Sequence, residues 1–192
     1  MKTYGLTAGI GMGKTTAANF LSARGLPVVD TDELARQFVQ PGEPALAEIR
    51  QAFGGDIVSA AGQLRRDELA RRVFADPAAR QKLEAILHPR IRERWQAQVA
   101  AWRTAGQPAA IVVIPLLFET GAESSFDSII CVACSAATQR ERLRARGWPA
   151  EEIARRRAAQ WPVEKKMALS RYVIWTEGEP AQVAAQLSRV IV

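Results

Sequence analysis

The sequence predicts an α/β protein in which a parallel sheet of about five strands is flanked by helices. Three observations support this prediction. The short segment 3–7 leads into a glycine-rich turn and then into a helix-forming segment. Residues 109–114 are apolar throughout, as in a strand that is covered on both faces of a parallel sheet. Residues 45–102 favour helix almost everywhere, which indicates a helical insertion between the strands.

The segment from Gly5 to Thr16 has the features of a phosphate-binding loop. Glycine lacks a Cβ, so Gly11 and Gly13 let consecutive N–H groups turn toward one anion. The helix expected to begin near Lys14 adds its positive end. Lys14 would reach the β- and γ-phosphates, and the Thr15 hydroxyl would ligate Mg²⁺. A surface turn is the alternative, but the order of strand, glycines, Lys-Thr and helix favours a nucleoside triphosphate site.

A pair of acids follows the second strand candidate, 26–29, and precedes a helical segment at 33–39. Carboxylates at the carboxyl end of a parallel strand lie where α/β folds bind ligands. Asp32 could cap the following helix, or it could accept the proton of an acceptor hydroxyl during phosphoryl transfer. We favour acceptor activation for Asp32 and a place in the metal shell for Asp30.

Helical candidates fill the next part of the chain. They include 45–53 and the amphipathic segment 64–74. A further helix begins at Asp76-Pro77 and is expected to break at His88-Pro89, before a long helix through Trp102. A helical block of this length would form a pocket for the acceptor substrate.

The clearest strand candidate, 109–114, runs into Pro115-Leu-Leu-Phe-Glu119. Many proteins with a phosphate-binding loop place an Asp at the end of such a strand to hold the Mg²⁺ shell, whereas this chain has Ile114 there. Glu119 could serve this purpose nearby, or it could simply start a turn.

Cys131 and Cys134 form a C-x-x-C pattern that suggests metal or redox chemistry. They lie in the apolar segment 128–134, which we expect to be a buried strand, where residues three apart point to opposite faces. The chain has no second Cys pair, and its only His is His88. Core packing is therefore the favoured interpretation of both cysteines.

The most basic segment follows the strand candidate 127–133. Ser135 is suited to cap the first of two helices, and the second helix carries Arg155–Arg157. Such a hairpin would close over ATP, exclude water and bring Arg to the transferred phosphate. The alternative is a solvent-exposed face on which Glu151 and Glu152 pair with neighbouring arginines. The density of Arg in the segment favours a lid.

The last strand candidate, 171–175, turns at Glu177-Gly-Glu-Pro180 into a closing amphipathic helix. The sequence contains no internal repeat and no flexible linker, which indicates one domain with three parts. These are a nucleotide-binding core of 1–39, 107–134 and 171–192, a helical acceptor subdomain of 40–106, and a lid of 135–170.

Composition agrees with a compact cytoplasmic protein. A length of 192 residues suits one domain, and no apolar run reaches the roughly 20 residues that span a bilayer. Because the first strand candidate begins almost at residue 1, we expect no signal peptide. The net charge of +6 suits a polyanionic partner, such as a nucleotide, a coenzyme or a nucleic acid. A solvated Arg-rich surface is the other explanation.

Several separate motifs line up along the chain. They are Gly5 to Thr16, Val28-Val-Asp-Thr-Asp32, Gly42-Glu-Pro-Ala-Leu46, Leu87-His-Pro-Arg90, Pro115 to Glu119, Arg142 to Arg146, and Gln160 to Lys166. With these motifs the chain resembles the dephospho-CoA kinase family over nearly its whole length. The resemblance implies transfer of the ATP γ-phosphate, with Mg²⁺, to the 3′-hydroxyl of the ribose of dephospho-CoA. CoA and ADP result, in the last step of coenzyme A synthesis. The implied fold is a P-loop NTPase-type core of five parallel strands with a helical CoA-binding domain and an Arg-rich lid.

The resemblance also implies roles for individual positions. Asp32 matches the acid proposed as general base, with Lys14 and Arg142 as further catalytic groups; Thr15 and Asp30 would hold the metal. The ATP-binding positions are Gly11, Met12, Gly13, Lys14, Thr15, Thr16, Arg142 and Arg146. The acceptor-binding positions are Asp32, His88, Arg90, Leu116, Leu117 and Glu119. Arg156 matches a further lid position.

The chain departs from the family pattern at three places. Ala8 replaces a frequent Gly, and Met12 stands where Ser is common, although only its backbone N–H is needed for phosphate. Trp175-Thr176-Glu177 stands where the last strand usually continues into Asp-Asn and a Gly turn. This third departure argues against an adenine-edge or lid-hinge role for the turn.

Two other functions are compatible with a phosphate-binding loop. A nucleoside monophosphate kinase also has an Arg-rich lid, but the acid pair at 30–32 and the His88-Pro89 segment argue against it. A basic nucleic-acid-binding ATPase or nucleotide switch would carry a recognised motif, and here the basic residues cluster in one hairpin. We therefore expect ATP and dephospho-CoA as partners, no nucleic acid, no membrane, and a monomer or weak homo-oligomer.

Overall fold

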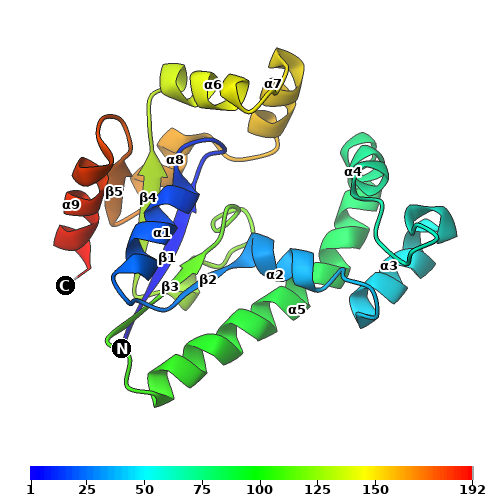
Figure 1. The fold of residues 1–192 in the computed structure, drawn as a ribbon, viewed down its shortest axis with the longest axis horizontal. Helices are drawn as coiled ribbons and strands as arrows, with labels where there is room; N and C mark the ends of the chain where they lie inside the picture. The colour runs from blue at the N-terminus through cyan, green and yellow to red at the C-terminus, as the bar shows by residue number, and fades with distance from the viewer. Residues whose placement is uncertain (192) are drawn as a thin grey trace. The chain divides into compact units, whose positions relative to one another are not determined.

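The computed structural model describes residues 1–191 and confirms the α/β fold. Its five-stranded sheet is parallel throughout, in the order β2-β3-β1-β4-β5, so β1 lies at the centre (Figure 1). Parallel neighbours need crossover connections, which explains why helices separate them in the chain. The strands are β1 (Lys2–Ala8), β2 (Val28–Asp30), β3 (Ala109–Val113), β4 (Ser128–Ala133) and β5 (Tyr172–Trp175).

Helices make up most of the remaining described chain. The α-helices are α1 (Lys14–Ala23), α2 (Thr31–Gln37), α3 (Pro44–Phe53), α4 (Arg66–Ala75), α5 (Pro77–Thr104), α6 (Ala136–Ala145), α7 (Ala150–Ala158), α8 (Val163–Leu169) and α9 (Pro180–Val190). The short 3₁₀ helices are η1 (Gly55–Ile57) and η2 (Glu123–Ser125). Ser135 caps α6 as expected, because its side chain accepts a hydrogen bond from the Thr138 N–H.

Two helices differ from the sequence-based expectation. The predicted break at His88-Pro89 is wrong, because α5 continues through Pro89. Proline removes one helical N–H donor and crowds the preceding turn, at a cost of about 3 kcal/mol. Packing on both sides of it offsets this cost, since Leu87 packs against one core cluster and Trp95 is only 5% exposed. In addition, α8 forms directly after Pro162, where no helix was predicted.

The described residues form two compact units. One unit contains Met1–Asp30 and the chain from Val99 onward, and therefore holds the whole sheet. The other unit, Thr31–Gln98, is helical and has its own small core of Val39, Ile49, Ile57 and Leu69. Asp30 and Asp32 consequently lie on opposite sides of this division, although they are only two positions apart in the chain.

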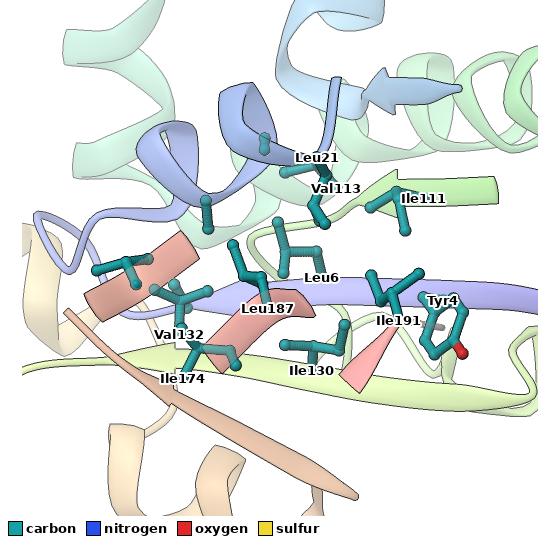
Figure 2. Packing of buried hydrophobic residues seen from close by; sticks show 14 of the residues in the cluster. Tyr4, Leu6, Leu21, Ile111, Val113, Ile130, Val132, Ile174, Leu187 and Ile191 are labelled. Atoms are coloured by element: carbon teal, nitrogen blue, oxygen red, sulfur yellow. The ribbon is translucent and has the colours of Figure 1, made fainter. Parts of the chain in front are cut away.

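The main core surrounds β1. Leu6 of β1, Ile130 of β4 and Ile174 of β5 pack with Leu21 of α1 and Leu187 of α9 (Figure 2). Each of these side chains is at most 1% exposed. Burial of one such side chain stabilises the fold by about 1.5–3 kcal/mol relative to its exposure. The cluster therefore fixes α1, and with it the loop that precedes α1, on the sheet.

The two cysteines belong to the core. Both are buried free thiols, and burial raises the pKa of Cys131 to about 12. Across residues 1–191, no group of three or more His, Cys, Asp and Glu side chains could hold a metal ion. The expectation of core packing is therefore confirmed. None of the helices in this described part has the length and apolar character needed to cross a membrane.

Candidate active site

The loop between β1 and α1 has the backbone conformation that its glycines permit. Gly11 and Gly13 have φ values of 74° and 89°, in the left-handed region that favours glycine. Gly13 precedes α1, and no side chain caps the helix there. The first turn of α1 therefore has N–H groups that can donate hydrogen bonds to an anion, and the helix dipole adds positive potential at the same point.

Two glutamines hold the start of this loop at the Ile10 peptide. The Ile10 N–H donates to Gln160 Oε1 at 3.0 Å, and the Ile10 carbonyl accepts from Gln139 Nε2 at 2.7 Å. Gln139 comes from α6 and Gln160 from the turn after α7. An added Cβ at Gly11 would lie 2.8 Å from Leu143 of α6, so the loop also packs closely against that helix. The basic segment thus fixes the conformation of the loop.

Lys14 and Asp30 form an ion pair at the carboxyl ends of β1 and β2. Lys14 Nζ lies 3.5 Å from Asp30 Oδ2, and the two side chains are 15% and 25% exposed. Asp30 is the last residue of β2 and pairs in register with Val113 of β3. The parallel sheet therefore brings the predicted phosphate ligand and the predicted metal-shell carboxylate together.

Asp32 is an exposed residue in the first turn of α2. Because α2 begins at Thr31, Asp32 is its second residue and not the residue that precedes the helix. An acid in a first helical turn interacts favourably with the positive end of the helix dipole. This position leaves the carboxylate accessible, as a proton acceptor requires.

A cavity of about 180 Å³ opens beside the loop. Pockets for drug-sized molecules have roughly 300–1,000 Å³, so this cavity has room for part of a nucleotide. It brings together five of the predicted ATP-binding residues with the turn after β5 and the start of α9. The lining residues are Gly11, Gly13, Thr16, Arg142, Arg146, Thr176, Gly178, Pro180 and Val183.

Glu177 ties the start of α6 to the turn after β5. Its Oε1 accepts from the Ser135 N–H at 2.9 Å and from the Thr138 hydroxyl at 2.6 Å, and Oε2 accepts from Trp175 Nε1 at 3.0 Å. The Ser135 and Thr138 hydrogen bonds stabilise the ionised form and lower the pKa of Glu177 to about 2. This turn therefore anchors the first helix of the basic segment. Figure 1 shows α6 and α7 beyond the carboxyl end of β4.

Glu119 anchors the other end of the basic segment. Its Oε1 lies 2.8 Å from Lys166 Nζ and accepts the Trp161 N–H, also at 2.8 Å. Lys166 is 0% exposed and donates a further hydrogen bond to the Pro115 carbonyl at 2.8 Å. The Trp161 ring stacks on Phe118 with an interplanar angle of 1°. These contacts favour a positioning role for Glu119 over direct contact with the acceptor.

The remaining predicted acceptor residues fall in both units. In the helical unit, Arg90 donates to Glu48 Oε1 at 2.5 Å and to the Ile86 carbonyl at 2.6 Å. His88 is exposed, and its pKa is lowered by partial desolvation and by nearby positive charge. In the sheet unit, Leu117 is 0% exposed, because it fills the space beside Gly5, whereas Leu116 is partly exposed.

Two arginines of α7 form the ion pairs that are expected if this helix is a charged, solvent-exposed face and not part of a lid. Glu152 forms ion pairs with Arg155 and Arg156. Arg156 also lies over the Trp148 ring, 4.4 Å from its centroid. Arg142 and Arg146 of the preceding segment line the cavity instead. The basic segment is thus divided between residues that face the candidate nucleotide site and residues paired with an acid on their own helix.

Four residues of the site were not predicted: Gln139, Gln160, Lys166 and Thr176. Gln160 and Lys166 are the first and last residues of one motif that carries the family resemblance. Their place in this motif was the only sign of their importance in the sequence. Gln139 sits in a polar helical stretch and carried no signal, yet it is 3% exposed. Contacts between distant parts of the chain give these polar residues their roles.

The oxygen ligands at the loop fit a Mg²⁺ ion. Thr15 offers a hydroxyl in the first turn of α1, and Asp30 offers a carboxylate beside Lys14. Mg²⁺ usually keeps several waters and takes only one or two protein ligands together with substrate phosphates. Such a site therefore does not require the acidic cluster that residues 1–191 lack.

Comparisons with known proteins show the family to which the chain is similar. A family model described as dephospho-CoA kinase matches residues 3–182. The dephospho-CoA kinase of Anaeromyxobacter dehalogenans is 44% identical over 192 residues, covering 100% of this chain and 91% of the relative. That of Bdellovibrio bacteriovorus is 40% identical over 191 residues, with 100% and 95% covered.

Solved structures show the same fold. The structure of TT1252 from Thermus thermophilus has a TM-score of 0.87 and 32% identity, covering 99% of this chain and 95% of that one. The dephospho-CoA kinase from Campylobacter jejuni has a TM-score of 0.72 and 22% identity, with 98% and 94% covered. A shikimate kinase from Bacteroides thetaiotaomicron, at a TM-score of 0.52 and 14% identity, shares the general fold over 98% of this chain and 95% of its own.

The Glu177 anchor predicts a pH-dependent contribution to stability. The folded pKa of about 2 lies below the ordinary 4.5, so the contribution is complete above about pH 4.5 and disappears as the pH falls toward 2. We expect Glu177→Gln to melt at a lower temperature than the unmodified protein at pH 7, and the difference to vanish near pH 2. Thermal unfolding followed by circular dichroism measures this. Glu179→Gln, without a capping hydrogen bond, is the control; an equal pH trend in both variants would contradict the prediction.

The buried ion pair predicts a large cost for removing one partner. Lys166→Met leaves the Glu119 carboxylate buried without a counter-charge, so we expect a loss of about 3–5 kcal/mol of unfolding free energy in urea titrations. Adding Glu119→Gln should recover part of this loss, because the neutral amide can still accept the Trp161 N–H. The exposed neighbour Lys165 lies over the Trp161 ring, and Lys165→Met should cost at most about 1 kcal/mol. Equal costs for the two lysines would refute the prediction.

Proposed function

The chain belongs to the dephospho-CoA kinase family, which phosphorylates dephospho-CoA to CoA in the last step of CoA biosynthesis, and we propose that its phosphate loop, Asp32 and Arg142 carry out this transfer. The co-substrate of the family is ATP. The observation that supports the proposal most strongly is the cavity in which loop glycines and two arginines meet. Phosphoryl transfer depends mainly on positioning and on neutralising charge, which these groups supply.

ATP binds with its phosphates on the loop. Backbone N–H groups of 11–16 surround the phosphate oxygens, and Lys14 leaves its pairing with Asp30 for the β- and γ-phosphates. Arg142 and Arg146, which line the same cavity, neutralise further charge on the phosphates. The Thr15 hydroxyl and the Asp30 carboxylate would hold Mg²⁺, which would neutralise charge on the phosphates.

Asp32 accepts the proton of the acceptor. The 3′-hydroxyl oxygen of the dephospho-CoA ribose forms the new bond to the γ-phosphorus. The bond from that phosphorus to the bridging oxygen of ADP breaks, and the hydroxyl proton passes to the Asp32 carboxylate. The exposure of Asp32 in the first turn of α2 supports this role.

The side chains that we propose for acceptor binding come from the resemblance to the family. His88, Arg90 and Leu116 are the side chains that we propose for contact with dephospho-CoA. Glu119 and Leu117 act indirectly, because both are occupied by protein contacts. We also propose that the protein works in the cytoplasm as a monomer or weak homo-oligomer, on small molecules and without nucleic acid.

The reaction is tested by supplying Mg²⁺-ATP with dephospho-CoA, AMP, CMP or no acceptor, and by measuring ADP and CoA. We expect ADP release to depend on dephospho-CoA and to match the CoA formed. Lys14→Ala should remove this activity, because the γ-phosphate loses its main counter-charge. Preference for a nucleoside monophosphate would overturn the proposed acceptor, and acceptor-independent release would point to an ATPase or a switch.

Asp32→Asn tests the proton acceptor. General base catalysis contributes about 10²–10⁴-fold, so we expect kcat to fall by at least about 100-fold with little change in the melting temperature. Glu33 lies next to Asp32 in the same first turn and is also exposed, which makes Glu33→Gln the matched control. The control should keep kcat within about threefold. If Asp32→Asn also stays within about threefold, Asp32 is not the base.

A further inference from the structure

Thr176 is held tightly at the point where β5 ends. It is 4% exposed, and its N–H donates to the Ala133 carbonyl at 2.9 Å, which extends the pairing of β4 and β5 by one residue. The Thr176 hydroxyl donates to the Met12 carbonyl at 2.9 Å. The Ala133 carbonyl is a longer alternative acceptor, at 3.3 Å. The hydroxyl therefore joins the end of the sheet to the middle of the phosphate loop.

Arg142 of α6 binds the same residue with two donors. One guanidinium NH2 group donates to the Thr176 hydroxyl at 2.9 Å, and the other donates to the Thr176 carbonyl at 2.6 Å. A guanidinium has five N–H donors in a fixed plane, so two such bonds set its orientation and leave three donors. Arg142 is thus oriented on the wall of the cavity by Thr176.

The position beside the loop also suits the size of threonine. An added Cβ at Gly13 would lie 3.1 Å from the Thr176 hydroxyl oxygen and 3.2 Å from its methyl carbon. Thr176 therefore packs directly on the last glycine of the loop. Thr176, Gly13 and Arg142 all line the same cavity, which places this contact within the candidate nucleotide site.

We propose that Thr176 is a positioning residue for ATP, and that its hydroxyl sets Arg142 in place against the phosphate loop before the nucleotide binds. A hydroxyl can accept from Arg142 and donate to Met12 at once, which neither a methyl nor an ammonium group can do. Ordering a long side chain on binding costs about 0.5–1.5 kcal/mol, so an arginine ordered in advance favours binding by about 3- to 10-fold. The proposal rests on the proposed function, since it presumes that ATP occupies this cavity.

The test compares three threonine variants by isothermal titration calorimetry with ATP. Thr176→Val keeps the shape and removes the hydroxyl, and we expect the Kd for ATP to rise about 3- to 10-fold. Thr176→Ser keeps the hydroxyl and should stay within about twofold. Thr3→Val is the matched control, because Thr3 is also buried, donates its hydroxyl to Asp127 at 2.7 Å, and lies at the opposite end of the parallel strands. It should leave the Kd unchanged even where it lowers the melting temperature.

A double-mutant cycle separates positioning from general stability. In an Arg142→Met background, Thr176→Val should change the Kd for ATP by less than about twofold, while its effect on the melting temperature persists. An unchanged Kd for Thr176→Val, or an equal rise with and without Arg142, would overturn the proposal. If Thr176→Val does not fold, Thr176→Ala removes the same hydroxyl without adding atoms, and the same limits apply to it.

The same calorimetric titration distinguishes failure of the proposed function from failure of the proposed role of Thr176. If the unmodified protein binds ATP and Lys14→Ala weakens that binding, the phosphate site stands, and an unchanged Kd for Thr176→Val overturns only the role of Thr176. If the unmodified protein does not bind ATP, the proposed function fails, and the role of Thr176 fails with it.

Discussion

The candidate active site depends on holding the glycine-rich loop in one conformation beside the cavity. To bind an anion, the loop would direct N–H groups near Gly11 and Gly13 outward, so its other polar groups need partners within the protein. The Ile10 peptide has both of its groups satisfied by glutamine side chains, and the Met12 carbonyl is satisfied by a buried hydroxyl. These bonds come from the basic segment and from the turn after β5. The conformation of the loop therefore depends on residues more than 100 positions away in the chain.

Charges in this protein have two separate uses, and burial distinguishes them. Lys166 and Glu119 form a pair in which the lysine is fully buried and the acid carries a second protein contact. Such a pair is costly to break and is suited to holding segments together. Lys14 and Asp30 are partly exposed and 3.5 Å apart, a looser arrangement that can exchange partners for a phosphate and a cation. The first pair serves architecture, and we assign the second to chemistry.

The sequence predicted the parts of the fold that local pattern determines. The apolar strands, the glycine-rich loop and the Ser135 cap depend on neighbours in the chain, and all were confirmed. The continuous helix through Pro89 and the clamp by Gln139 and Gln160 depend on packing and on partners distant in sequence. A polar side chain carries no local sign of the backbone group that it will meet, so these contacts were not predictable.

The anchors on the basic segment limit how a lid could move. Its first end is tied by Glu177 to Ser135 and Thr138, and by Arg142 to Thr176. Its second end is tied by Gln160 to the loop, and by Lys166 to Glu119. Opening at either end would break a buried ion pair or several charge-assisted bonds, each worth more than a neutral hydrogen bond. A closing movement that keeps these anchors and the packing of Leu143 is therefore confined to residues 144–159, within which Arg146 faces the cavity while Arg155 and Arg156 remain paired with Glu152.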